Sequence, residues 1–227
     1  MFLNRHNLDI AKLASKEESR YVLGAILANE TDTIVTDGHC LVIVSKPPVP
    51  ESAPVVEGFE RVDTPRLIPR QCALDLAKLA KGADFNVVQL GKNGNGAKPA
   101  AAIDNSIVYF DPIDGQFPNY KAVMPNHRDA VFTINLDPQL LGKVLDVVNS
   151  AIGKEKRLAR EVTFRFYDKD KAIRIDATNV DAGQQITAVV MPMTNQYHGA
   201  PYWHTRDFHP PQPEAPAAEP ETETKEG

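Results

Sequence analysis

Two neighbouring residues, His39 and Cys40, are the first candidates for chemistry, because an imidazole beside a thiol can activate a cysteine nucleophile. Adjacent residues of a strand point to opposite faces, however, so this pair makes a poor catalytic dyad. Asp111 and Asp114 could share acid–base work as paired carboxylates, but their spacing in a polar segment is more typical of a turn. These patterns predict a protein with no catalytic residues that is not an enzyme.

Metal and phosphate sites have equally little support. His198, His204 and His209 do not have the spacing of a closed metal site, and two cysteines are too few for a zinc cluster or a disulfide framework. The run Asn93-Gly94-Asn95-Gly96 predicts a hairpin turn rather than a phosphate-binding loop. We therefore expect no metal and no cofactor.

The composition is that of an ordinary globular domain. The 227 residues are 42% hydrophobic and 24% charged, and they contain no signal peptide and no apolar run that could span a bilayer, so we expect a cytoplasmic protein without a membrane partner. The formal net charge is −5, but residues 213–227 hold five glutamates and one lysine, which leaves −1 for the rest. A near-neutral body can still carry a basic face.

Three short motifs in order carry more information than any single residue type. They are Thr36-Asp37-Gly38-His39-Cys40-Leu41, Gly115-Gln116-Phe117-Pro118-Asn119-Tyr120 and Met191-Pro192-Met193. The first is a turn between two β-branched runs, where Gly38 can adopt a positive φ without steric cost. Together they resemble the motifs of the bacterial sliding clamp, the β subunit of DNA polymerase III, over roughly residues 1–195. Cys40 stands where the clamps usually have arginine.

The resemblance implies a hydrophobic pocket for linear peptide motifs of polymerases and repair proteins. A shallow apolar pocket with a flexible thioether can adapt to several apolar peptides. The alternative is that the same residues are ordinary turn and core positions. The expected pocket residues are Leu13, Thr36, Gly38, His39, Leu41, Pro118, Val123, Val189 and Met191.

The resemblance also implies that helices line a hole around duplex DNA, which would be held by sequence-independent attraction to its phosphates. For any single lysine the alternative is a solvated helix face, and nearby acidic residues weaken the signal. The expected DNA-facing residues are Lys12, Lys16, Arg70, Lys78 and Lys143.

Hydrophobic periodicity predicts the elements that position these residues. Three helices are expected at 7–18, with Asn7 as the N-cap, at 71–81 and at 137–152. Strands are expected at 1–4, 21–28, 33–36, 40–45, 66–69, 85–90, 100–103, 107–110, 131–134, 161–167, 173–175 and 185–191. The proline-rich segment 46–65 is interpreted as a connector.

The order strand, helix and three strands thus recurs about three times. The predicted fold class is α+β and similar to the DNA clamps, with antiparallel sheets backed by helices. Residues 1–125 resemble the middle domain of a clamp and 126–195 resemble the second half of its last domain. Residues 196–227 form an aromatic, histidine-rich segment and then an acidic, proline-rich tail. A clamp subunit has six such units, so this chain is a shortened relative.

The function implied by the resemblance is that of a processivity factor in DNA replication. It would encircle double-stranded DNA as a homo-oligomer and tether DNA polymerase and other proteins with clamp-binding motifs. One alternative is a monomeric peptide-binding adaptor, or a competitor of a full-length clamp, that does not encircle DNA. Another is an enzyme whose site the sequence does not reveal.

Overall fold

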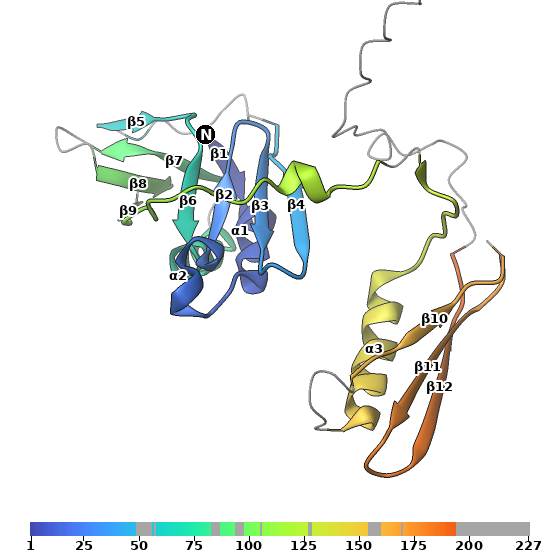
Figure 1. Cartoon of the computed structure of the whole chain (residues 1–227). Helices are drawn as coiled ribbons and strands as arrows, with labels where there is room; N and C mark the ends of the chain where they lie inside the picture. The colour runs from blue at the N-terminus through green and yellow to red at the C-terminus, as the bar shows by residue number, and fades with distance from the viewer. Residues whose placement is uncertain are drawn as a thin grey trace, which may run out of the picture. The chain divides into compact units, whose positions relative to one another are not determined.

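The structure is a computed structural model of the chain, which divides into two compact units, Met1–Val123 and Met124–Gly227 (Figure 1). The tail predicted at 196–227, with its three histidines, and the turn residues 94–96 lie outside the described residues. The described residues are 1–48, 56, 58–82, 87–93, 98–104, 106–126, 129–153, 160–168 and 170–193.

The first unit contains two antiparallel sheets. The four-stranded sheet has the order β4-β3-β2-β6, and the other has the order β1-β7-β8-β9, with β5 also paired to β7. The strands are β1 (Phe2–Asn4), β2 (Ala25–Ala28), β3 (Asp32–Thr36), β4 (Leu41–Ser45), β5 (Phe59–Arg61), β6 (Arg66–Pro69), β7 (Val87–Asn93), β8 (Lys98–Ile103) and β9 (Ser106–Tyr109). The helices are α1 (Arg5–Asp9), the 3-10 helices η1 (Ile10–Leu13), η2 (Glu18–Gly24) and η4 (Tyr120–Val123), and α2 (Arg70–Ala80).

The two sheets exchange their leading strands. β1 precedes α1 but pairs with β7, where Phe2 lies opposite Gln89. β6 precedes α2 but pairs with β2, where Ile68 lies opposite Ile26. Each strand–helix–three-strand half therefore contributes one strand to the sheet of the other half, and neither sheet is complete without both halves.

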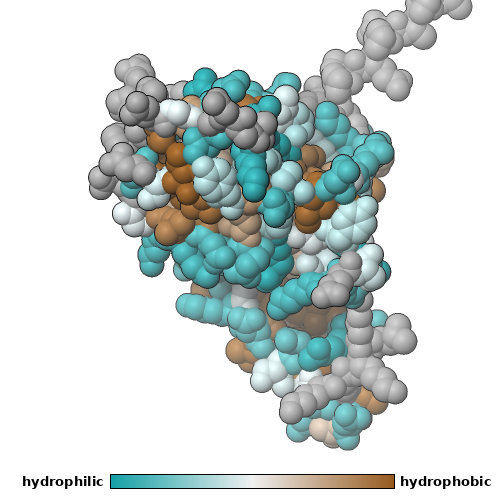
Figure 2. All heavy atoms as spheres, turned by 90° about the vertical axis from the view of Figure 1, so that its left-hand side faces the viewer, coloured by the Kyte–Doolittle hydropathy of each residue, from teal (hydrophilic) through white to brown (hydrophobic). Residues whose placement is uncertain are grey.

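One hydrophobic core joins the exchanged halves. α1 packs against α2, and Leu8 and Leu76 are fully buried between the helices and the sheets. Ile26 and Val88, one from each sheet, belong to the same cluster. Hydrophilic residues cover much of the face seen in Figure 2, with smaller hydrophobic patches between them.

The second unit is a single half of the same kind. Its helix α3 (Pro138–Ile152) packs on the three-stranded sheet β10-β11-β12, formed by Thr163–Arg165, Ile173–Asn179 and Gln184–Val190 (Figure 1). Asp137 is the N-cap of α3, and its side chain accepts hydrogen bonds from the backbone N–H groups of Gln139 and Leu140 at 2.7 and 3.4 Å. The side chains of Val148 and Ile152 are buried between the helix and the sheet.

The predicted fold class is confirmed, but three element predictions are wrong. The helix expected at 7–18 begins at Arg5, changes to 3-10 geometry at Ile10 and ends at Leu13. Its N-cap is Asn4, not Asn7, because the two side chains form a reciprocal capping box. The backbone N–H of Ser15 then bonds to the carbonyl of Leu23, which directs the chain away from the helix.

The strand expected at 21–28 is also shorter, since residues up to Gly24 form η2 and the strand begins at Ala25. A short apolar run does not distinguish a strand from a helical turn. The connector at 46–65 contains an additional strand, β5, which pairs with β7.

The third incorrect element is the strand expected at 131–134, because these residues form no strand. Segments in the same position of the first unit become β1 and β6 because the other half provides a sheet edge. The second unit contains one half, so its leading segment meets no such edge within the described part of the chain.

No helix in the described part of the chain combines the length and the apolar character that a membrane crossing requires.

Asn7 provides a test of how α1 is attached to the four-stranded sheet. Its buried Nδ2 donates hydrogen bonds to Thr33 Oγ1 and to the Ser45 carbonyl, at 3.1 and 3.0 Å. We expect Asn7→Leu to lower the free energy of unfolding of the first unit by about 1–3 kcal/mol, because the buried Thr33 hydroxyl loses a hydrogen-bond partner. Chemical denaturation measures this. His6→Ala, at an exposed neighbouring position, is the control and should change stability by less than about 0.5 kcal/mol.

Candidate functional site

The turn between β3 and β4 is held by its own side chains. Asp37 Oδ1 accepts hydrogen bonds from the backbone N–H groups of His39 and Cys40, both at 2.8 Å. Thr36 Oγ1 accepts one from the N–H of Gly38 at 3.0 Å. Gly38 has a φ of 90°, which explains why glycine occupies this position. The turn is therefore a rigid exposed corner rather than a loose loop.

These hydrogen bonds determine the charge state of the corner. The backbone N–H groups of Cys40 and then His39 lower the pKa of Asp37 below its ordinary value. His39 and Cys40 lie in this turn and not in a strand, and both are exposed. The corner therefore carries the Asp37 carboxylate, which accepts hydrogen bonds from backbone N–H groups, and the exposed His39 imidazole.

The 3-10 helix η2, which the sequence analysis did not predict, lies beside this corner. A Cβ on Gly38 would lie 3.6 Å from an Arg20 guanidinium nitrogen and 3.8 Å from Leu23 Cδ1. On another side of η2, a Cβ on Gly115 would lie 2.7 Å from Val22 Cγ2. Thus η2 contacts both the Gly38 turn and the segment that contains the second motif. The apolar run at 21–28 was the available signal, but it was interpreted as a strand.

The structure brings part of the predicted peptide pocket together. Leu13 is half-buried in η1, which packs against β3, the strand that ends at Thr36. Thr36 pairs with Leu41 across the turn. Leu13, Thr36 and Leu41 are therefore supported by the same sheet as the Gly38 corner.

The segment with Pro118 and Val123 is attached to the first unit at another point. The Asn29 side chain donates a hydrogen bond to Tyr120 Oη at 3.3 Å, next to the start of β3. Pro118 and Val123 are exposed, and the Val123 side chain is 71% accessible. A depression beneath this segment is lined by residues that include Leu27, Leu67 and Phe117.

Val189 and Met191 belong to the second unit, unlike the other predicted pocket residues. Residues of a strand alternate between faces, so Val189 faces away from the core that its neighbour Val190 enters, and Met191 follows the end of the strand. The side chains of Val189 and Met191 are 56% and 63% exposed. Both are accessible to a partner.

A groove beside α1 and α2 contains two of the five residues predicted to face DNA, Lys12 and Lys78. Its lining includes Arg5, Lys12, Lys78 and Lys81, with Asp9 among them. Asp9 forms ion pairs with Arg5 at 3.2 Å and Lys12 at 3.0 Å. The groove therefore retains an excess of cations, and it adds Arg5, which the sequence analysis missed.

The remaining predicted DNA contacts lie outside this groove. Lys16 follows η1 and is exposed, Arg70 is only partly exposed at the first residue of α2, and Lys143 is exposed on α3 in the second unit. Lys78 forms an ion pair with Asp75 at 2.9 Å, and the hydrogen bonds from Lys78 and then Gln71 lower the pKa of Asp75. Lys12 and Lys78 are thus the predicted residues that share one surface.

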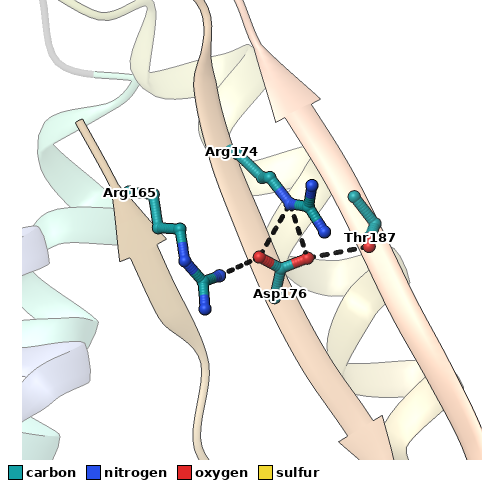
Figure 3. A network of polar contacts seen from close by, with 4 residues as sticks. All are labelled: Arg165, Arg174, Asp176 and Thr187. Atoms are coloured by element: carbon teal, nitrogen blue, oxygen red, sulfur yellow. Dashed lines mark hydrogen bonds and ion pairs between the residues drawn. The ribbon is translucent and has the colours of Figure 1, made fainter. Parts of the chain in front are cut away.

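A second polar cluster lies on the sheet of the second unit (Figure 3). Asp176 accepts hydrogen bonds from Arg165, from Arg174 Nε at 2.8 and 2.9 Å, and from Thr187 Oγ1 at 2.7 Å. The Thr187 hydroxyl and then Arg174 lower the pKa of Asp176. Since the carboxylate joins residues of β10, β11 and β12, this cluster holds the sheet together. Both guanidinium groups already have an anionic partner.

The described residues do not meet the requirements of a metal site, and the Cys72 thiol does not meet those of a reactive thiol. They contain no group of three histidine, cysteine or acidic side chains that could hold a metal ion. Burial raises the pKa of Cys72 to about 11, so its thiol stays protonated and is a poor nucleophile at neutral pH.

Comparisons with known proteins were made by family, by sequence and by structure. No family model matches the chain. It is 26% identical over 197 residues to the beta sliding clamp of Caulobacter vibrioides, covering 83% of this chain and 47% of that protein. It is 26% identical over 191 residues to the beta sliding clamp of Escherichia coli K12, covering 81% and 45%.

Solved clamp structures show the same fold. A sliding clamp from Pseudomonas aeruginosa superposes with a TM-score of 0.63 at 19% identity, over 87% of this chain and 52% of that one. A clamp from Caulobacter crescentus superposes with a TM-score of 0.60 at 23% identity, over 85% and 50%. The resemblance to sliding clamps is confirmed, and the chain spans about half the length of the relatives it matches.

The Asp37 turn gives a prediction about pH. Because its folded pKa is lowered, the carboxylate stabilises the turn above the ordinary aspartate pKa of about 3.9, and this contribution is lost as the pH falls through the lower folded pKa. We expect the amide resonances of His39 and Cys40 to titrate with a midpoint below that ordinary value. An NMR pH titration measures this midpoint. Asp37→Asn keeps an acceptor oxygen and should abolish the titration; a midpoint above the ordinary value would contradict the assignment.

Proposed function

We propose that this protein is a DNA sliding clamp-like accessory protein of replication, a processivity factor without catalytic activity of its own. The observation that carries the proposal is the cationic groove between α1 and α2 in a protein with the clamp fold. Its partners are double-stranded DNA on the helical surface and polymerase peptides at the apolar pocket. A cytoplasmic location follows from this role.

The groove is suited to contacts with the phosphate backbone. Arg5 and Lys12 lie in α1 and η1, and Lys78 and Lys81 lie at the end of α2. These helices pack against each other, so the four charges are held on one surface. Long flexible cations attract phosphates without reading bases. Binding to DNA would therefore be independent of sequence and weakened by salt.

The Gly38 corner is suited to a different partner, an apolar linear peptide. Leu13 and Leu41 offer apolar contacts, and the exposed His39 imidazole offers a polar anchor. Val189 and Met191 of the second unit offer further apolar contacts for a peptide, since their side chains are exposed. The methionine thioether adapts to peptides of different shape.

Encirclement of DNA requires a closed ring, and the chain spans about half the length of the relatives it matches. In the proposed function copies of the chain assemble as a homo-oligomer. The exposed Gly38 corner favours a second candidate, a monomeric adaptor or competitor that binds clamp-binding peptides without encircling DNA, because a peptide could reach this corner in a single chain. Retention of the full chain on circular duplex DNA but not on linear DNA separates the two.

The DNA groove is tested by charge reversal. We expect Lys12→Glu/Lys78→Glu to weaken binding of the full chain to duplex DNA, because two cations become anions on the groove. If these lysines contact two phosphates, the slope of log K against log salt should become shallower by about 1.8. Fluorescence anisotropy over a salt series measures both quantities. Lys98→Glu/Lys121→Glu makes the same change in net charge at exposed positions outside the groove, and an equal effect of both pairs would refute the assignment.

The peptide pocket is tested by removing the thioether of Met191. We expect Met191→Ala to weaken the binding of a fluorescent clamp-binding peptide by about tenfold, since truncating an apolar anchor costs more than 1 kcal/mol. Titration monitored by anisotropy gives the dissociation constant. Met193→Ala is the matched control, with a similarly exposed methionine two residues away. Binding that is absent from the wild type, or equal in all three proteins, would argue against the pocket.

A further inference from the structure

The helix α3 has two adjacent apolar stripes, and only one of them is covered. Leu141, Val148 and Ile152 lie against the sheet of the second unit. Leu140, Val147 and Ala151 are exposed and spaced at i, i+7 and i+11, so they form a second stripe along the helix, whereas Val144 packs partly on the sheet. Leu140 and Val147 are 50% and 68% exposed.

A second incomplete feature lies directly before α3. Val131 is fully exposed and Phe132 is 45% exposed, in a segment rich in β-branched residues that forms no strand. The first strand of the sheet, β10, is paired to β11 on one side, and its other edge has no partner strand among the described residues. The unit thus contains an apolar stripe, a potential strand and an open sheet edge.

The first unit shows how a half of this kind is completed within the same chain. Its strand β2 occupies the place of β10, between the central strand of its own half and the leading strand of the other half. β2 pairs with β6 over Ala25–Ala28 but with β3 over Leu27 and Ala28 alone. At the same time α1 packs against α2. In the first unit, each half supplies a helix, a leading strand and a sheet edge that contact the other half. The apolar stripe, segment 131–134 and the β10 edge are the corresponding features of the second unit.

We propose that the second unit binds the second unit of another copy of this chain. The α3 helices pack through the stripe of Leu140, Val147 and Ala151, and each segment 131–134 adds as an antiparallel strand to the outer edge of the other copy's β10. The arrangement is isologous, so both copies make the same contacts. The result is a complete two-half domain shared between two chains.

A second copy fits this surface better than the other available partners. The stripe contains no charged residue, whereas DNA requires cations. A linear peptide could cover the helix or the strand edge, but it would leave segment 131–134 without a sheet. Of these three partners, only a second copy supplies a helix stripe, a strand and a sheet edge that match those of the first copy. This inference does not depend on the proposed DNA or peptide binding.

Light scattering of the full chain after size exclusion tests the proposal. We expect a dimer at micromolar concentrations, and Val147→Glu should raise its dissociation constant by about tenfold or more, because a charge would be buried at a helix contact. Val180→Glu is the matched control, since Val180 is 63% exposed in the same unit but lies outside the stripe. Circular dichroism at low concentration should show that both variants keep the fold.

Thr133→Pro examines the strand addition separately. Proline removes the backbone N–H that an added strand would donate, while the residue is exposed and outside any strand in the single chain. We expect this variant to weaken the dimer without changing the circular dichroism of the monomer. A strictly monomeric wild type, or a dimer whose dissociation constant responds no more to Val147→Glu and Thr133→Pro than to Val180→Glu, would overturn the proposal.

Discussion

The exchange of leading strands between two sheets is the constraint on which the first unit depends. β1 completes the sheet of β7, and β6 completes the sheet of β2, so each half supplies backbone hydrogen bonds that the other half needs. A sheet edge exposes unpaired N–H and C=O groups, and pairing it removes that cost. The exchange also forces α1 and α2 together above a common core, where Leu8 and Leu76 are fully buried.

The cationic groove is a direct consequence of this packing. Arg5 and Lys12 come from one half, and Lys78 and Lys81 come from the other. Each half alone would present two of these cations among acidic neighbours such as Asp9 and Asp75. Since the buried faces of the helices are fixed against each other, the charged faces adjoin as well. The surface proposed for DNA is thus a product of the same exchange that stabilises the core.

The second unit shows what happens when the same half occurs once. Its core of Val148, Ile152 and Ile175 forms because one helix and one sheet are sufficient to bury these residues. Its leading segment, however, remains outside any strand, and Val147 remains exposed. One half can therefore bury a core of its own, whereas a complete two-sheet domain contains two halves.

Sequence alone determined the features that depend on neighbouring residues. Periodicity predicted α2 and α3 to within one residue at each end, and the β-branched runs predicted β3 and β4 around the Gly38 turn. The three motifs identified the clamp resemblance and placed Lys12 and Lys78 among the candidate DNA contacts. These predictions succeeded because hydrophobic spacing and turn chemistry act over a few residues.

Tertiary structure decided whatever depends on a distant partner. Asn7 became a buried bridge to Thr33 and Ser45 instead of a helix cap, because the sheet beside it supplied acceptors. The apolar run at Tyr21 became η2, and Arg5 joined the groove only through the packing of α1 on α2. The strand expected at 131–134 did not form, although its composition is that of a strand. A strand is stabilised by hydrogen bonds to a neighbour that can be far away in the sequence, and no local pattern records whether that neighbour is present.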